Sequence, residues 1–211
     1  MLSPRLQAVL ELIEPCKVLA DIGTDHAYLP IEAYRAGLCE KAIASDINPG
    51  PLKIAESNIK AAGLSKKIET RLGDGLNPLN PGEADCIVIT GMGGMRIIGI
   101  LNEKTQNARL ILQPQHDLEE LRRNLHAKGY AIEEKLVREA SRFYIIICAK
   151  KASNVKAWSD KEYFLGNLSG EFWQSYLQQK REKIERYIHS ISDNAARIKA
   201  EQQLKWIEET L

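Results

Sequence analysis

Short runs of apolar and β-branched residues alternate with stretches of helical periodicity from residue 17 to about residue 128. The predicted strands lie at Lys17–Gly23, Ala42–Ile47, Ile68–Leu72, Asp85–Thr90 and Arg109–Leu112. The predicted helices lie between and after them, at Leu29–Ala36, Pro51–Ala62, Met95–Asn102 and Leu118–Lys128, with Gly37, Gly63 and Gly129 as C-terminal caps. This alternation is typical of an α/β, Rossmann-like fold, in which helices cover both faces of a parallel sheet.

Two further strand-like runs, Tyr130–Glu139 and Arg142–Lys150, are separated only by Ala140 and Ser141. Two residues are too few for a helical crossover, so these strands must pair as an antiparallel hairpin. A parallel sheet that ends in such a hairpin resembles the seven-stranded sheet of class I methyltransferases and differs from an ordinary dinucleotide-binding sheet. We therefore predict one domain of this type over residues 1–152.

Beyond residue 152 only helical patterns remain, which predicts an α-helical extension over residues 153–211. Ser159 and Glu162 form a capping-box pattern that begins a short helix. Apolar residues then recur at intervals of seven, as in a coiled-coil stripe, at Leu177, Ile184, Ile191 and Ile198, with Ile188 and Ala195 beside them. Two alternatives are open: an amphipathic helix packed on the main domain, or a break at Asp193–Asn194 and a hairpin that ends near Trp206.

The composition is that of a soluble protein, with 27% charged residues and a formal net charge of +1. No window approaches the roughly 18 consecutive apolar residues of a membrane helix, and the N-terminus lacks the residue order of a secretory signal. We therefore expect a cytoplasmic protein without a membrane partner. The cysteines are far apart and are expected to be free thiols, so no metal site is predicted; they are Cys16, Cys39, Cys86 and Cys148.

Acidic residues stand at the ends of the first three predicted strands. Asp21 precedes Gly23 and Thr24, where the first strand meets the first helix and backbone N–H groups can hold an anionic group. Asp46 ends the second strand about 20 residues later, where a carboxylate can accept both hydroxyls of a ribose. Asp74 follows the third strand beside Gly75, where it can bind an adenine amino group. This series predicts a nucleoside site.

The fourth predicted strand ends in a glycine-rich turn, Thr90–Gly94, at the sheet edge where ligands of this fold bind. The first loop has a single glycine instead of G-x-G-x-x-G, and Asp25 follows it. A carboxylate is unfavourable beside a pyrophosphate, which argues against a nicotinamide-dependent oxidoreductase. It suits a cofactor that carries a sulfonium and an ammonium group, namely S-adenosylmethionine.

Five runs carry a more specific resemblance: DIGTDHAYLP at 21–30, SDINPGPL at 45–52, GDGL at 73–76, GMGG at 91–94 and LQPQ at 112–115. Together they resemble the TrmK family of bacterial tRNA (adenine-N1) methyltransferases, which act on the adenine at position 22 of tRNA. The resemblance covers the whole chain, including the helical arm. It implies S-adenosylmethionine as the cofactor and tRNA as the partner.

The resemblance implies cofactor residues: Asp21, Gly23 and His26 at the methionine end, Asp46 and Ile47 at the ribose, and Asp74 and Gly75 at the adenine. The positions of the first loop and of the glycine-rich turn add Thr24, and Gly91, Met92 and Gly93 near the methyl group. Neutral adenine already has a lone pair on N1, so methyl transfer needs alignment more than a general base. The base must be turned out of the folded tRNA.

His26 and Tyr28 are the residues expected to position that base, with Gln113 and Gln115 as lesser candidates and Arg5 as a distant one. Core packing is the alternative for Tyr28. A basic run in the arm is expected either to contact RNA or to form a solvated helix face, and consists of Lys180, Arg181, Lys183 and Arg186. The open alternatives are a methyltransferase for another RNA or a small molecule, and a non-catalytic RNA-binding module. The oligomeric state is left open, with a monomer as the working expectation.

Overall fold

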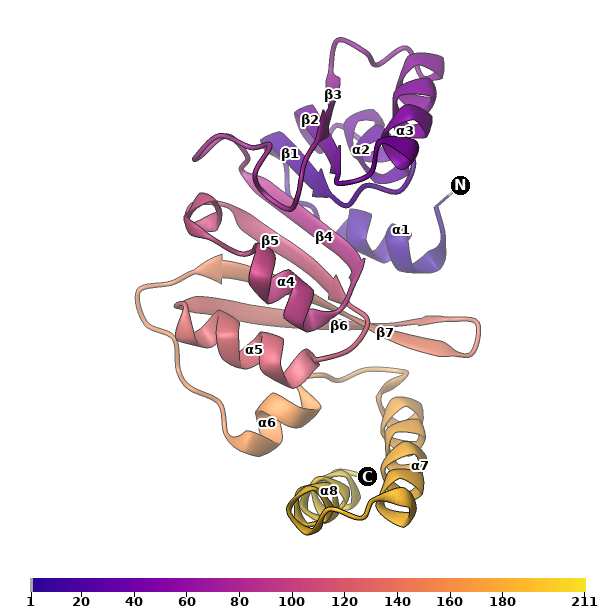
Figure 1. Cartoon of the computed structure of the whole chain (residues 1–211), viewed down its shortest axis with the longest axis vertical. Coiled ribbons are helices and arrows are strands. Elements are labelled where there is room, and N and C mark those ends of the chain that lie inside the picture. Colours follow the sequence, from indigo (N-terminus) through magenta and orange to yellow (C-terminus); the bar gives the residue numbers. More distant parts are fainter. Residues whose placement is uncertain (1) are drawn as a thin grey trace.

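The computed structural model describes residues 2–211, and seven of its strands form one sheet in the order β3-β2-β1-β4-β5-β7-β6 (Figure 1). The strands are β1 (Cys16–Ile22), β2 (Cys39–Asp46), β3 (Ile68–Leu72), β4 (Cys86–Met92), β5 (Arg109–Pro114), β6 (Tyr130–Glu139) and β7 (Arg142–Lys151). The first five run parallel, whereas β7 runs antiparallel to both β5 and β6. This confirms the predicted parallel array and its terminal hairpin.

Helices cover both faces of the sheet (Figure 1). One face carries α1 (Pro4–Glu11), α2 (Tyr28–Arg35) and α3 (Pro49–Ala61), and the other carries α4 (Gly94–Ile100), the 3-10 turn η1 (Glu103–Thr105) and α5 (Leu118–Ala127). Within β4, Ile87 and Ile89 pack into the core under α4 and α5, while Val88 packs into the core under α1 to α3. Successive strand residues point to opposite faces, which is why these strands are apolar at nearly every position.

Helix α1 was not predicted. The Ser3 hydroxyl caps it by accepting from the backbone N of Leu6, and Pro4 occupies its first turn. Serine followed by proline is a helix-start signal that the sequence does contain. Ala8 and Val9 are buried, and the helix packs near β6.

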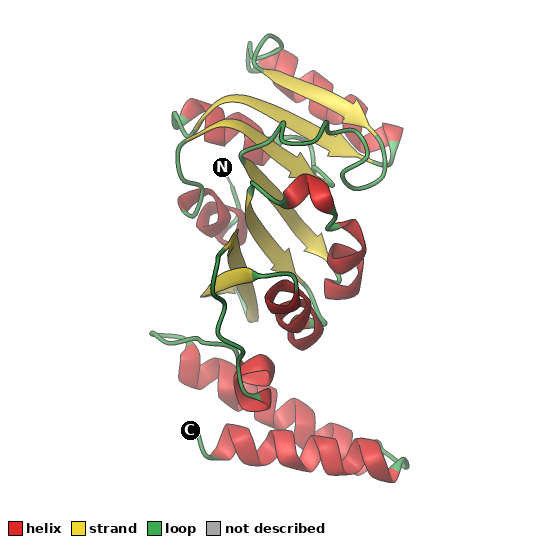
Figure 2. Ribbon diagram, turned by 90° about the vertical axis from the view of Figure 1, so that its left-hand side faces the viewer, coloured by secondary structure: helices red, strands yellow, loops and turns green. Residues whose placement is uncertain are grey.

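The C-terminal arm consists of α6 (Asp160–Leu165), α7 (Trp173–Ser190) and α8 (Asn194–Glu208), and its two long helices lie side by side (Figure 2). The capping box of Ser159 and Glu162 is formed as predicted. The seven-residue repeat does not lie on one helix, because α7 ends before Ile191 and Asp193 caps the start of α8. Ile198, the last member of the repeat, is 60% exposed. A continuous coiled-coil stripe is therefore wrong, and the chain returns as a helical hairpin.

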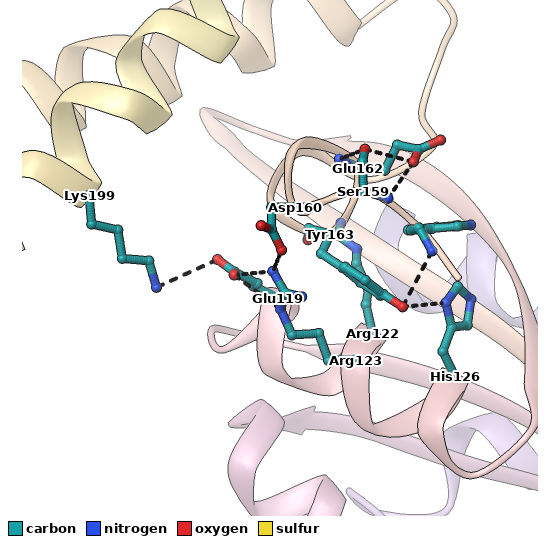
Figure 3. A network of polar contacts seen from close by, with 10 residues as sticks. Glu119, Arg122, Arg123, His126, Ser159, Asp160, Glu162, Tyr163 and Lys199 are labelled. Carbon is teal, nitrogen blue, oxygen red and sulfur yellow. Dashed lines mark hydrogen bonds and ion pairs between the residues drawn. The ribbon is translucent and has the colours of Figure 1, made fainter. Parts of the chain in front are cut away.

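Polar contacts join the arm to α5 (Figure 3). The Arg123 guanidinium lies 2.9 Å from the Glu119 carboxylate on its own helix and 2.7 Å from that of Asp160 on α6. Nδ1 of His126 lies 3.0 Å from the Tyr163 hydroxyl, also on α6. These contacts tie α6 to the main domain.

Lys180 on α7 does not belong to a solvated basic face. Its Nζ donates to the carbonyl oxygen of Phe164 at 3.1 Å and lies 3.9 Å from the centroid of the Phe164 ring. Burial lowers the pKa of Lys180 to about 7. The predicted basic run is thereby corrected: Lys183 and Arg186 are exposed, Arg181 is half-buried, and Lys180 packs inward.

None of the helices within residues 2–211 is long and apolar enough to span a bilayer. Over the same residues, no three His, Cys, Asp or Glu side chains are grouped as ligands for a metal ion. The four cysteines are free thiols, of which Cys39, Cys86 and Cys148 are buried.

Candidate functional site

The carboxyl ends of the parallel strands enclose a pocket of about 230 Å³. Residues from four strand ends and from α4 line it: Ile22, Gly23, Asp46, Ile47, Asn48, Gly73, Asp74, Gly75, Thr90, Gly91, Met92, Arg96 and Ile100. Seven of these are among the predicted cofactor residues, namely Gly23, Asp46, Ile47, Asp74, Gly75, Gly91 and Met92. They come together because parallel strands end at the same edge of the sheet.

Asp21 and Thr24 flank the lining residues Ile22 and Gly23 in the sequence but do not line the pocket themselves. Both side chains are buried, and the Thr24 hydroxyl donates to Oδ2 of Asp21 at 2.6 Å. Burial raises the pKa of Asp21 to about 6; the negative charges of Asp25 and Asp46 act in the same direction, while the bond from Thr24 opposes them. The carboxyl group is therefore mostly ionised at pH 7 and takes up a proton as the pH falls below about 6.

Gly23 permits the close approach of the first loop to the fourth strand. Its φ is +74°, and a Cβ at this position would lie 2.3 Å from Cε of Met92. The backbone N–H groups of Gly23 and Thr24 both donate to the carbonyl of Ser45 at 2.8 Å, which ties the loop to the end of β2. A side chain at Gly23 would clash with Met92, which lines the pocket.

The ends of β2 and β3 are also fixed by hydrogen bonds. The backbone N of Asn48 donates to Oδ1 of Asp46 at 2.7 Å, and the N–H of Gly73 donates to the carbonyl of Asp46 at 3.0 Å. Lys104 then holds the loop that carries Asp74, because its Nζ donates to three backbone carbonyl oxygens at 2.6–3.3 Å, those of Leu76, Asn77 and Leu79. The two acidic strand ends are thus held in a defined relative position.

Strand β4 extends two residues beyond its predicted end, through Gly91 to Met92, and the pairing with β5 shifts there. Gly91 has a φ of +77°. Gly93 caps α4 and does not line the pocket. A Cβ at Gly93 would lie 2.4 Å from the His116 ring. The glycines of this turn therefore serve two purposes: Gly91 faces the pocket, and Gly93 makes room for a neighbouring side chain.

His26 and Tyr28 lie outside the pocket, at the start of α2. His26 has a φ of +60°, and its Nε2 lies 3.0 Å from Oδ1 of Asp25. Asn58 supports this strained turn by donating to the carbonyl of His26 at 2.9 Å. Tyr28 is 49% exposed, so its alternative role in core packing is wrong. The two ring centroids are 5.6 Å apart, and both residues lie close to the loop of Gly23.

Comparisons with known proteins decide the family. The sequence pattern of the methyltransferase domain matches residues 2–147. The tRNA (adenine(22)-N(1))-methyltransferase of Bacillus subtilis (strain 168) is 39% identical over 176 residues, which cover 81% of this chain and 74% of that protein. The chain belongs to the TrmK family.

Solved structures of similar proteins agree with this family fold. A protein from Streptococcus pneumoniae, crystallised with S-adenosyl-L-methionine, superposes with a TM-score of 0.90 at 32% identity over 99% of both chains. The TrmK of M. capricolum, solved with S-adenosyl-homocysteine, superposes with a TM-score of 0.88 at 29% identity and covers 100% of this chain and 97% of its own. Both likenesses include the helical arm.

Six residues that line the pocket of this TrmK-family chain were not among the named cofactor residues: Ile22, Asn48, Gly73, Thr90, Arg96 and Ile100. The first four lie within the predicted site motifs, so only Arg96 and Ile100 lie outside every motif. Arg96 and Ile100 lie one turn apart on α4, and their spacing places them on one helix face. No local pattern indicates that this face meets the pocket, because the packing of α4 on the sheet decides it.

Proposed function

We propose that this chain transfers a methyl group from S-adenosylmethionine to N1 of the adenine at position 22 in tRNA. The observation that carries the proposal is the pocket at the carboxyl edge of the sheet, with Asp46 and Asp74 at successive strand ends and Gly91 at its far side. The membership in the TrmK family supports it, since the B. subtilis relative is named for this reaction.

The residues of the pocket fit S-adenosylmethionine. Asp46 is held by Asn48 at the end of β2, where it would accept the ribose hydroxyls, while Ile47 and Ile100 offer apolar walls for a purine. Asp74 would bind the adenine amino group. The carboxylates outnumber the one arginine in the lining, which suits a cationic cofactor and disfavours a pyrophosphate.

The methionine end would lie against Gly23, above the buried Asp21. Asp21 would attract the ammonium group of the cofactor, directly or through water. Thr24 would act indirectly, by orienting Asp21 through its 2.6 Å hydrogen bond. His26 and Gly93 do not line the pocket, and in this proposal His26 belongs to the base-binding side of the site while Gly93 makes room for His116.

When bound, S-adenosylmethionine supplies a methyl group on a cationic sulfur. The acceptor N1 of neutral adenine carries a lone pair, so no proton has to leave and the chain needs no general base for this step. The protein's contribution is alignment of the two reactants. Turning the base out of the tRNA exposes N1, and Tyr28, exposed beside His26, would hold it by stacking.

The tRNA would extend along an open groove of about 560 Å³ between the β6–β7 hairpin and α7. Three cationic side chains, Arg142, Lys183 and Arg186, line the groove against one acidic side chain, Glu182. Pro114 and Gln115 line its end next to β4 and the cofactor pocket. Cationic side chains that follow a groove are the usual means of binding a phosphate backbone. The groove therefore supports an RNA substrate over a small molecule.

The test is incubation of the purified protein with unmodified tRNA and labelled S-adenosylmethionine, followed by nucleoside analysis. We expect N1-methyladenosine, and none from a transcript in which position 22 is guanosine. Asp46→Ala should abolish measurable cofactor binding by calorimetry. Glu40→Ala, an exposed carboxylate at the other end of β2, is the matched control and should leave binding unchanged. Transfer to another RNA, a small molecule or nothing would overturn the proposal.

A further inference from the structure

Two polar side chains that do not line the nucleoside pocket lie close to Gly91, which does line it. Gly91 has a φ of +77°, and the position that its Cβ would occupy lies 3.8 Å from Nη1 of Arg5 and 3.8 Å from Nε2 of Gln115. Neither of these side chains lines the nucleoside pocket, whereas Gly91 and Met92 do. The guanidinium and the amide thus lie near Gly91, beside which the transferred methyl group is expected in the proposed function.

Arg5 is held in place by three other elements. Its Nη1 donates to Oε1 of Gln113 on β5 at 2.6 Å, its Nε lies 3.8 Å from the Glu139 carboxylate on β6, and its guanidinium carbon lies 5.4 Å from the centroid of the Tyr144 ring on β7. Gln113 is fully buried, and its Nε2 donates to the carbonyl of Pro114 at 2.9 Å. Both ends of the Gln113 amide are therefore used, which makes it a positioning residue for Arg5 and not a contact for a substrate.

Gln115 differs from Gln113 in being exposed. Its backbone N–H donates to the carbonyl of Met92 at 2.9 Å, so its Cα is fixed relative to the cofactor pocket. The amide offers an acceptor and a donor side by side. An adenine offers the matching pair, the N6 amino group and N7, and this is the edge that glutamine reads in nucleic acids.

We propose that Gln115 determines the specificity for adenine by binding the N6 and N7 atoms of the target base; the proposal rests on the proposed function. Recognition of this edge leaves N1 unoccupied, as methyl transfer to N1 requires. Guanine presents two acceptors at the same edge, O6 and N7, so its O6 would face the amide oxygen. The Arg5 guanidinium, held by Gln113, forms the wall beside the base, and a guanidinium plane is a common surface for stacking an unpaired base.

The experiment combines variants with atomic changes in the base. Single-turnover methylation is measured on ligated tRNAs that carry adenosine or 7-deazaadenosine, which lacks N7, at the target position. With the wild-type protein, loss of N7 should slow the reaction about tenfold. Gln115→Ala should be slowed by a similar factor on adenosine and should show little further loss on 7-deazaadenosine, because the partner of N7 is already absent. Gln115→Glu, which lacks the donor, should show the same convergence.

Cofactor affinity and folding are measured on every variant. Gln115→Ala should bind S-adenosylmethionine within about twofold of the wild type and keep its melting temperature. Gln106→Ala, an exposed glutamine before the opposite end of β5, is the matched control and should behave as the wild type with both tRNAs. An equal effect of 7-deazaadenosine on wild type and Gln115→Ala, or a loss of cofactor binding, would overturn the role of Gln115. Absence of any N1-methyladenosine with wild-type protein would instead overturn the proposed function.

Discussion

The buried ion pair between Arg122 on α5 and Glu134 on β6 offers the sharpest test of how the arm is attached. Both side chains are 0% exposed, and Nε of Arg122 lies 2.7 Å from Oε1 of Glu134. Nη1 of Arg122 also donates to the carbonyls of Tyr163 and Phe164 at 2.8 and 3.3 Å, and Oε2 of Glu134 accepts from the backbone N of Asn167 at 2.9 Å. The pair therefore anchors the end of α6 to the main domain.

Arg122→Leu removes one partner and leaves the Glu134 charge buried. Breaking a buried pair in this way costs about 3–5 kcal/mol, a large part of the roughly 5–15 kcal/mol that stabilises a typical domain. Glu134→Leu should cost a similar amount. The double variant Arg122→Leu/Glu134→Leu should be less damaging than either single change, because no unpaired charge remains. It should not recover fully, since the two carbonyls of α6 still lose their donor.

Urea titration followed by two probes measures these effects. The three tryptophans are Trp158, Trp173 and Trp206, so their fluorescence reports on the arm and its attachment, while circular dichroism reports on the whole chain. In Arg122→Leu the fluorescence transition should precede the circular dichroism transition. Arg35→Leu removes an exposed ion pair on α2 and is the control, with an expected change below about 1 kcal/mol. A loss below about 1 kcal/mol in Arg122→Leu, or a double variant as unstable as the sum of the singles, would refute the reasoning.

Three further predictions concern single side chains. Asp21 has a pKa of about 6, so S-adenosylmethionine should bind more tightly as pH rises from 5 to 7, and calorimetry with Asp21→Asn should show no such dependence. Burial gives Lys180 a pKa of about 7 in the folded chain, against 10.5 in the unfolded chain. Between pH 7 and 10.5 the unfolded chain therefore binds one more proton than the folded chain, so the free energy of unfolding should rise with pH over this range. Urea titrations of Lys180→Met should show a smaller rise. Lys104→Met should loosen the loop that carries Asp74, so S-adenosylmethionine should bind about tenfold more weakly while the rate at saturating cofactor stays unchanged. An unchanged dissociation constant would show that Lys104 is not needed to hold this loop in place.

Local patterns were sufficient for the strands, most of the helices and the order of the acidic residues. The strand-like runs and the two-residue link of the hairpin follow from short-range hydrophobicity and from the length a crossover needs. Asp46 and Asp74 could be placed at one site because parallel strands share a carboxyl edge. The start of α1 was also readable, from Ser3 and Pro4, but a helix of eight residues has a weak periodic signal.

Tertiary packing determined the contacts between residues that lie far apart in the sequence. Arg5 meets Gln113 across 108 residues of sequence, and the packing of α4 on the sheet brings Arg96 and Ile100 to the pocket. Repeats of seven left open a continuous stripe or a break at Asp193–Asn194; the structure has the break, where the Asp193 side chain caps α8, and the packing of α7 on α8 completes the hairpin. The basic pattern around Lys180 predicted RNA contacts or a solvated helix face. In the structure the Lys180 side chain packs against Phe164, where its amine donates to the Phe164 carbonyl and lies over the Phe164 ring. Sequence periodicity reports which residues prefer burial, and only the folded chain determines which partners they meet.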